Sequence, residues 1–139
     1  MIIGRECSKG QVEQAIFGQV NVAASQSAVA IPVAGTSGGN TSWPLQFAGD
    51  MVGFSWSLSA AGTTGAFTIV PTINGTAIST AYQSTVGTAT KGRVNIPRGA
   101  IRCLATDVIG VKVTTAAGWD GTTSDLTVVV RVITELEGV

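Results

Sequence analysis

The residue types that most enzymes use for acid–base and nucleophilic chemistry are scarce in this sequence. The chain has 139 residues and no histidine, so it lacks the commonest general base, the commonest metal ligand and any Ser-His or Cys-His pair. Asp120 and Asp125 form a close acidic pair in a predicted surface loop, where turn formation is favoured over a Ca²⁺ site that would recruit more oxygens. We therefore expect no enzyme, no catalytic residue, no metal site and no cofactor.

A run of four cations is the most distinctive charge pattern. No acidic residue lies within this run, whereas Glu135 and Glu137 make the C-terminus acidic. The cations are Lys91, Arg93, Arg98 and Arg102. Nucleic-acid binding would need a larger basic excess, because the chain's 8 cations are balanced by 8 acids. The run indicates either a solvated strand face or a basic edge that meets an acidic patch on a neighbouring copy or partner.

Two tryptophans fall in loops rich in glycine, serine and threonine. Trp43 ends the loop over residues 34–44, and Trp119 precedes Asp120 in a second loop. Exposed loop tryptophans are typical of contact sites, but packing over one end of the fold is an equal alternative. Trp43, Trp119 and Asp120 are therefore candidate loop contacts.

Alternating apolar residues predict the strands that position these loops. Within residues 50–80, two apolar series share a period of two, and Asn74-Gly75 supplies residues that tolerate the positive φ of a type I′ hairpin turn. The predicted core positions are Val52, Phe54, Trp56, Leu58, Phe67, Ile69 and Ile73. Two further series predict strands near the C-terminus, at Ile109, Val111 and Val113 and at Leu126, Val128, Val130 and Val132.

The composition indicates one domain with a partly covered surface. Charged residues make up 12% of the chain, and the formal net charge is zero. Soluble monomers usually carry a net charge that keeps them apart, so a homo-oligomer or a permanently docked protein is expected. No long amphipathic pattern is available for parallel crossovers, which favours an antiparallel β-sandwich of the jelly-roll type with seven or eight core strands. Pro32 places its short apolar run at a sheet edge or at the end of a strand.

The N-terminal segment differs from this pattern and is interpreted as an extended arm over residues 1–20, followed by a sandwich domain over residues 21–139. Ser8 and Gln11 have capping-box spacing that favours a short helix, with an ordinary first strand as the alternative. The arm's candidate partner contacts are Ile2, Ile3, Arg5, Ile16 and Phe17. No secretory signal or membrane span is predicted, and Cys7 and Cys103 are expected to be unpaired thiols.

Roughly residues 45–134 resemble the small jelly-roll modules of tailed-bacteriophage virion proteins, notably capsid decoration (cement) proteins and fibre head domains. The resemblance rests on DMVGFSWSLSAAGTTGAFTIVPTINGTAI, GRVNIPRGAIRCLATDVIGVKVTT and LTVVVRV. It implies a protein made in the host cytoplasm that trimerises, docks on the major capsid protein and stabilises the capsid surface, without nucleic acid or membrane. The alternative is a receptor- or carbohydrate-binding head that uses Trp43, Trp119, Asn40 and Asp120.

Overall fold

The computed structural model describes residues 11–34 and 39–135, and the regular secondary structure of these residues is almost entirely β-strand. Six strands have five or more residues, five have two, and one short 3₁₀ helix, η1, lies between β6 and β7. In chain order the elements are β1 (Gln11–Gln19), β2 (Val29–Ala30), β3 (Trp43–Pro44), β4 (Gly49–Leu58), β5 (Phe67–Ile73), β6 (Thr76–Ala77), η1 (Thr80–Tyr82), β7 (Ser84–Thr85), β8 (Lys91–Asn95), β9 (Arg102–Cys103), β10 (Val108–Thr115) and β11 (Leu126–Thr134).

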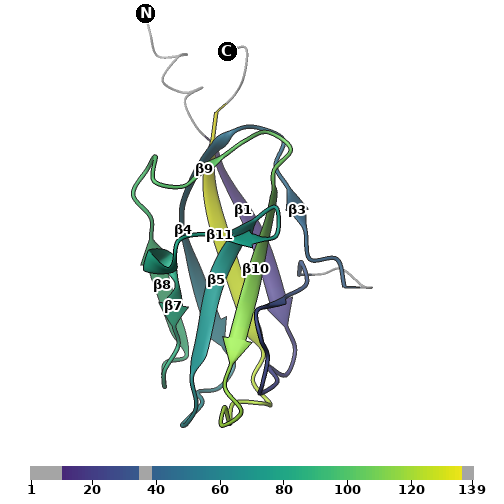
Figure 1. Cartoon of the computed structure of the whole chain (residues 1–139), viewed down its shortest axis with the longest axis vertical. Coiled ribbons are helices and arrows are strands. Elements are labelled where there is room, and N and C mark those ends of the chain that lie inside the picture. The colour runs from purple at the N-terminus through teal and green to yellow at the C-terminus, as the bar shows by residue number, and fades with distance from the viewer. Residues whose placement is uncertain (1–10, 35–38, 136–139) are drawn as a thin grey trace, which may run out of the picture.

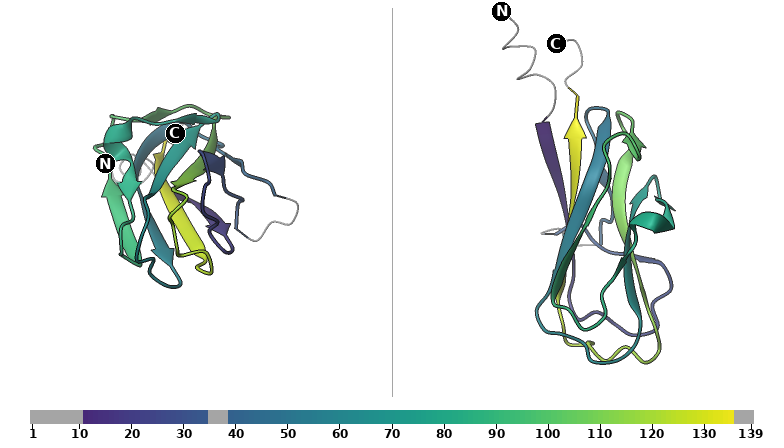
Figure 2. Two further views of the ribbon diagram at one scale, coloured as in Figure 1. Left: turned by 60° about the horizontal axis from the view of Figure 1, so that its bottom comes forward. Right: turned by 90° about the vertical axis from the view of Figure 1, so that its left-hand side faces the viewer.

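Two antiparallel sheets pack face to face (Figure 1), which confirms the predicted all-β sandwich. Sheet A has the order β1-β11-β4-β8, with β9 paired to the beginning of β4. Sheet B has the order β2-β10-β5-β6, with β3 on β10 and β7 on β5. The right-hand view of Figure 2 shows β1, β11 and β4 in one layer and β10 in the other. β2 pairs only with β10, so the run before Pro32 lies at a sheet edge as predicted.

The core forms between the inner faces of the two sheets, and the predicted alternation is confirmed on β10 and β11. The inward side chains of these strands are Ile109, Val111, Val113, Leu126, Val128, Val130 and Val132, all buried. Phe67 and Ile69 of β5 are also buried. The turn after β5 has positive φ at both Asn74 (52°) and Gly75 (82°), as a type I′ hairpin requires, and it pairs Ile73 with Thr76.

A β-bulge in β4 corrects the prediction for Val52. Arg131 of β11 pairs with Gly53, but the next residue, Val132, pairs with Met51, so Val52 is an additional residue on β4. Met51 is fully buried and Val52 only half-buried, because the bulge moves the alternation by one position. Gly53 has φ +148°, and a Cβ atom there would clash with the carbonyl oxygen of Val94. The backbone of the bulge therefore requires glycine.

Strand β1 corrects the boundary of the predicted arm. All nine residues of Gln11–Gln19 pair with β11, and Phe17 is fully buried in the core beside Ala15. Residues 11–19 are therefore part of the sandwich, and no helix begins at Gln11. Phe17 cannot contact a partner, because its side chain lies between the sheets. Three of the other candidate arm contacts, Ile2, Ile3 and Arg5, lie outside the described residues.

Candidate functional site

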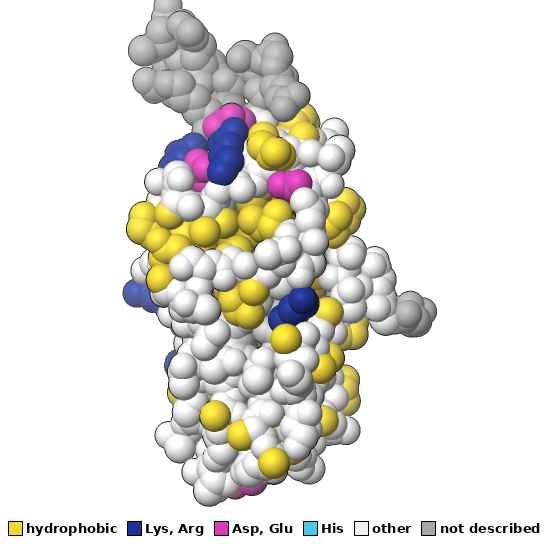
Figure 3. Space-filling model, in the orientation of Figure 1, with side chains coloured by type: hydrophobic (Ala, Val, Ile, Leu, Met, Phe, Trp, Pro, Cys, Tyr) yellow, Lys and Arg dark blue, Asp and Glu magenta, His cyan; other side chains and the backbone are white. Residues whose placement is uncertain are grey.

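Ion pairs gather at one end of the sandwich. Figure 1 shows this end, where β1 begins and β11 ends. Asp50 at the start of β4 accepts from Arg98 Nε at 3.3 Å and lies 3.5 Å from Arg102 Nη1. The two guanidinium nitrogens Nη1 and Nη2 of Arg102 also donate to the Glu135 carboxylate at 3.0 and 3.1 Å. Figure 3 shows positive and negative side chains side by side at this end. Half of the predicted basic run therefore finds its acidic partners within the same chain.

This charged end is structural in character. Asp50 is only 7% exposed, because Arg98 and Arg102 lie against it. The hydrogen bond between Arg102 and Glu135 raises the pKa of the guanidinium and lowers the pKa of the carboxyl. Both groups are exposed to solvent, which screens their attraction. The network ties β4, β9 and the end of β11 together.

The other half of the basic run lies on the outer face of sheet A. Lys91 pairs with Ser57 and Arg93 with Ser55, and both serines alternate with the buried Phe54 and Trp56. Lys91 and Arg93 therefore point away from the core. Within the described residues, neither cation takes part in a salt bridge.

The β1 side of the same outer face carries exposed apolar residues on either side of Gln14, which pairs with Arg131. Val12 and Ile16 of β1 are 58% and 37% exposed, and they pair with Ile133 and Val129 of β11, which are half-buried. The predicted contact residue Ile16 is therefore at the surface, on the opposite side of β1 from Phe17. We call Val12, Ile16, Val129 and Ile133 the apolar ridge.

The two candidate tryptophans have different surroundings. Trp43 is half-buried on β3, and its Nε1 donates to Glu13 Oε1 at 3.1 Å. Trp119 is 2% exposed, packs against Phe67 with ring centroids 4.9 Å apart, and donates from Nε1 to the carbonyl oxygen of Val22. The prediction of Trp119 as a loop contact is therefore wrong. It closes one end of the core, which was the alternative.

Asp120 and Asp125 hold loops, as the turn interpretation predicted. Asp120 Oδ1 accepts from the backbone N–H groups of Thr63 at 2.8 Å and Thr64 at 3.2 Å, and its Oδ2 accepts from the Thr63 hydroxyl. These hydrogen bonds lower the pKa of Asp120 to about 2. Asp125 Oδ1 accepts from the backbone N–H of Asn21 at 3.0 Å. In the part of the chain that the structure describes, no group of potential ligands is arranged for a metal ion.

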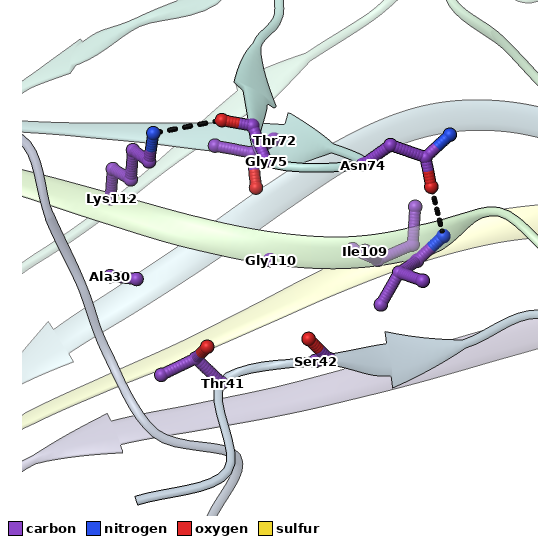
Figure 4. Close-up of a pocket in the computed structure, with 10 residues that line it drawn as sticks. Ala30, Thr41, Ser42, Thr72, Asn74, Gly75, Ile109, Gly110 and Lys112 are labelled. Atoms are coloured by element: carbon purple, nitrogen blue, oxygen red, sulfur yellow. Dashed lines mark hydrogen bonds between the residues drawn. The ribbon is translucent and has the colours of Figure 1, made fainter.

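A polar cleft of about 330 Å³ on the outer face of sheet B was not predicted from the sequence (Figure 4). Gly110 forms its floor, where a Cβ atom would lie 2.6 Å from Thr72 Oγ1. Lys112 Nζ already donates to the carbonyl oxygen of Gly75 at 2.8 Å, and Asn74 Oδ1 accepts from the backbone N–H of Val108 at 2.9 Å. The Lys112 ammonium and the Asn74 side-chain oxygen in this cleft therefore already form hydrogen bonds within the protein.

Cys103 is a free, fully buried thiol, as expected for an unpaired cysteine. Burial raises its pKa to about 11, so the thiol stays protonated near neutral pH. A protonated, inaccessible thiol is neither a nucleophile nor a metal ligand. None of the described elements is a helix long and apolar enough to cross a membrane.

Comparison with known proteins gives a match in fold. No protein-family model and no curated protein matches the sequence. Among solved structures, the chain is similar to one described as the cyanophage Pam1 capsid asymmetric unit, with a TM-score of 0.53 and 15% sequence identity. The similarity covers 92% of this chain and 87% of that chain, so it extends over most of the chain.

Proposed function

We propose that this protein is a structural virion component that docks as an oligomer on the assembled capsid of a bacteriophage and stabilises it. The observation that carries the proposal is the similarity in fold, over 92% of the chain, to a protein of a cyanophage capsid. The phage-like sequence segments support the same proposal independently. The partner would be the major capsid protein, and the oligomer a homotrimer.

The chemistry of the described residues suits a structural role. The thiol of Cys103 is buried and the loop carboxylates of Asp120 and Asp125 accept hydrogen bonds from the protein. No histidine is available anywhere in the sequence. Among the described residues, the candidate surfaces for contact with a partner are the outer face of sheet A and its apolar ridge.

Stabilisation would arise by mass action. A protein that binds the assembled shell but not its separated subunits shifts the equilibrium toward the shell. Many copies on one shell give a large total effect even when each copy binds weakly. A rigid sandwich suits this role, because little conformational entropy is lost when it docks.

The alternative function, a receptor- or carbohydrate-binding head, has less support. It would use Trp43 and Trp119 as a stacking platform, but the indole of Trp119 lies in the core. The carboxylate of Asp120 accepts from two backbone N–H groups and a hydroxyl, so it has little capacity left for a ligand.

Cryo-electron microscopy of virions of the phage that encodes this chain tests the proposal. We expect density for the sandwich on the outside of the shell, in symmetric clusters of three. Density at a tail tip or fibre end would contradict the proposal and favour receptor binding. Sedimentation of the purified protein at micromolar concentration tests the trimer before attachment.

A further inference from the structure

Three cations on the outer face of sheet A have no acidic partner among the described residues. Lys91 and Arg93 project from β8, and Arg131 projects from β11, where it pairs with Gly53. Arg131 Nη1 donates to Ser55 Oγ at 3.2 Å, so its guanidinium lies over β4, the strand between β11 and β8. The salt bridges of the described chain involve only Arg98 and Arg102, which face Asp50 and Glu135. The middle of this face is therefore basic.

A hollow of about 350 Å³ lies on this face at the β-bulge. Arg93 and Arg131 both line it, and Gly53 leaves no side chain between Arg131 and Asn95 of β8. The hydroxyl of Ser55 and the amide of Asn95 add neutral polar groups. A second, mostly apolar hollow continues along β8 and is lined by Ser55, Trp56, Lys91, Gly92 and Arg93. The bulge thus provides space between two guanidinium groups, and no carboxylate lines either hollow.

The apolar ridge flanks Arg131, which lies between Val129 and Ile133 on β11 and pairs with Gln14 of β1. It consists of side chains from β1 and β11 that point away from the core, with Val12 the most exposed. A surface that combines an apolar strip with adjacent arginines has the composition of a protein–protein contact. Nucleic-acid surfaces instead place exposed aromatic rings among the cations, whereas Phe54 is 2% exposed and Trp56, which also lines the second hollow, is 4% exposed.

We propose that the hollow between Arg93 and Arg131 binds a carboxylate side chain of a partner protein, while the apolar ridge packs against the partner beside it. Arginine pairs with carboxylates through two parallel hydrogen bonds, and two guanidinium groups over a glycine give such a group both charge and room. Only the identity of the partner, the capsid shell, rests on the proposed function. The docking face would then be the outer face of sheet A, and the shell would be acidic where it meets this face.

A titration that needs no capsid tests the hollow directly. We would add a hexaglutamate peptide to ¹⁵N-labelled protein at low salt and follow the backbone amide signals, because weak charge pairing is strongest at low ionic strength. We expect changes at Gly53, Ser55, Arg93, Asn95 and Arg131. These changes should disappear in Arg93→Glu and persist in the control Lys112→Glu, which makes the same charge change on sheet B.

Three results of this titration would overturn the proposal. The first is that hexaglutamate shifts no amide signals of sheet A. The second is that Arg93→Glu and Lys112→Glu reduce the shifts equally. The third is that hexathymidylate shifts the same amide signals more strongly than hexaglutamate does, which would indicate that the site binds nucleic acid. Arg93 is exposed, so Arg93→Glu should fold. Unchanged dispersion of the amide signals checks this, and Arg93→Gln provides a milder variant.

Co-sedimentation with shells that lack this protein separates the inference from the proposed function. We expect wild-type protein and Lys112→Glu to bind equally, and Arg93→Glu to bind about tenfold or more weakly. Wild-type affinity of Arg93→Glu would overturn the docking face and leave the decoration role intact. Failure of the wild type to bind shells would contradict the decoration role, and the peptide titration would still decide the carboxylate site.

Discussion

The two faces of sheet A are built by the same strands and have opposite physical roles. On the inner face, Phe17, Phe54 and Trp56 are buried against sheet B. On the outer face, one residue away in each case, Ile16, Ser55 and Ser57 face outward. Because a strand alternates its side chains, stability and docking can be assigned to neighbouring residues without conflict. Substitutions one position apart should therefore affect different properties.

The largest expected difference is between Phe17 and Ile16 on β1. Phe17→Ala should lower the free energy of unfolding by about 3–5 kcal/mol, because it removes a fully buried ring and leaves a cavity. Ile16→Ala should cost less than about 1 kcal/mol, because its side chain is 37% exposed. Urea denaturation measures both. Equal, small losses would mean that β1 is not part of the cooperative core and would restore the extended arm.

A smaller difference is expected between charges that have internal partners and charges that do not. Asp50→Ala should cost about 1–2 kcal/mol, because it removes a mostly buried carboxylate that pairs with Arg98 and Arg102, whose own side chains are partly exposed and screened by solvent. Arg93→Ala should change stability by less than about 0.5 kcal/mol, because Arg93 is exposed and has no acidic partner in the described chain. Thermal or urea unfolding at low salt compares the two. A larger loss for Arg93 would show that the outer face contributes to folding.

These contrasts also explain which features the sequence could predict. Alternation predicts β10 and β11 correctly because the inward positions are apolar except for one buried threonine at the end of each strand, Thr115 and Thr134. Asn74-Gly75 predicts its turn because few residues tolerate two positive φ angles. Both signals are local. They identify the class of fold without needing to know which strands pair.

The features that sequence analysis missed depend on distant residues. The bulge at Val52 arises because Gly53 and Met51 pair with the consecutive residues Arg131 and Val132 of β11. The acidic partners of Arg102 lie far from it in the sequence, at Asp50 and Glu135. Trp119 is buried because Phe67 packs against its ring, while Gly62 and Gly121 leave room for the ring and Gly65 leaves room for the Trp119 backbone. β1 was interpreted as an arm because polar and charged residues surround Ala15 and Phe17 and weaken the alternation. In each case, a residue's role is set by a tertiary contact.

The smallest expected effect concerns Asp120, whose charge has internal partners in the loops. Its folded-state pKa of about 2 lies below the ordinary value of 3.8, mainly because of the hydrogen bond from the Thr63 side chain. A depressed carboxylate pKa stabilises the fold above pH 3.8, and this contribution is lost as the pH falls through about 2. Amide signals of Thr63 and Thr64 should therefore titrate with a midpoint near pH 2, whereas signals on the outer face of sheet A should not follow this transition. Thr63→Val should raise the midpoint toward the ordinary value, and Asp120→Asn should abolish the transition. If the midpoint in the wild type lies at the ordinary value, the Asp120 carboxylate does not hold the loops. The charge of Asp120 would then contribute as little to the stability of the fold as the charges of the cations on the outer face of sheet A.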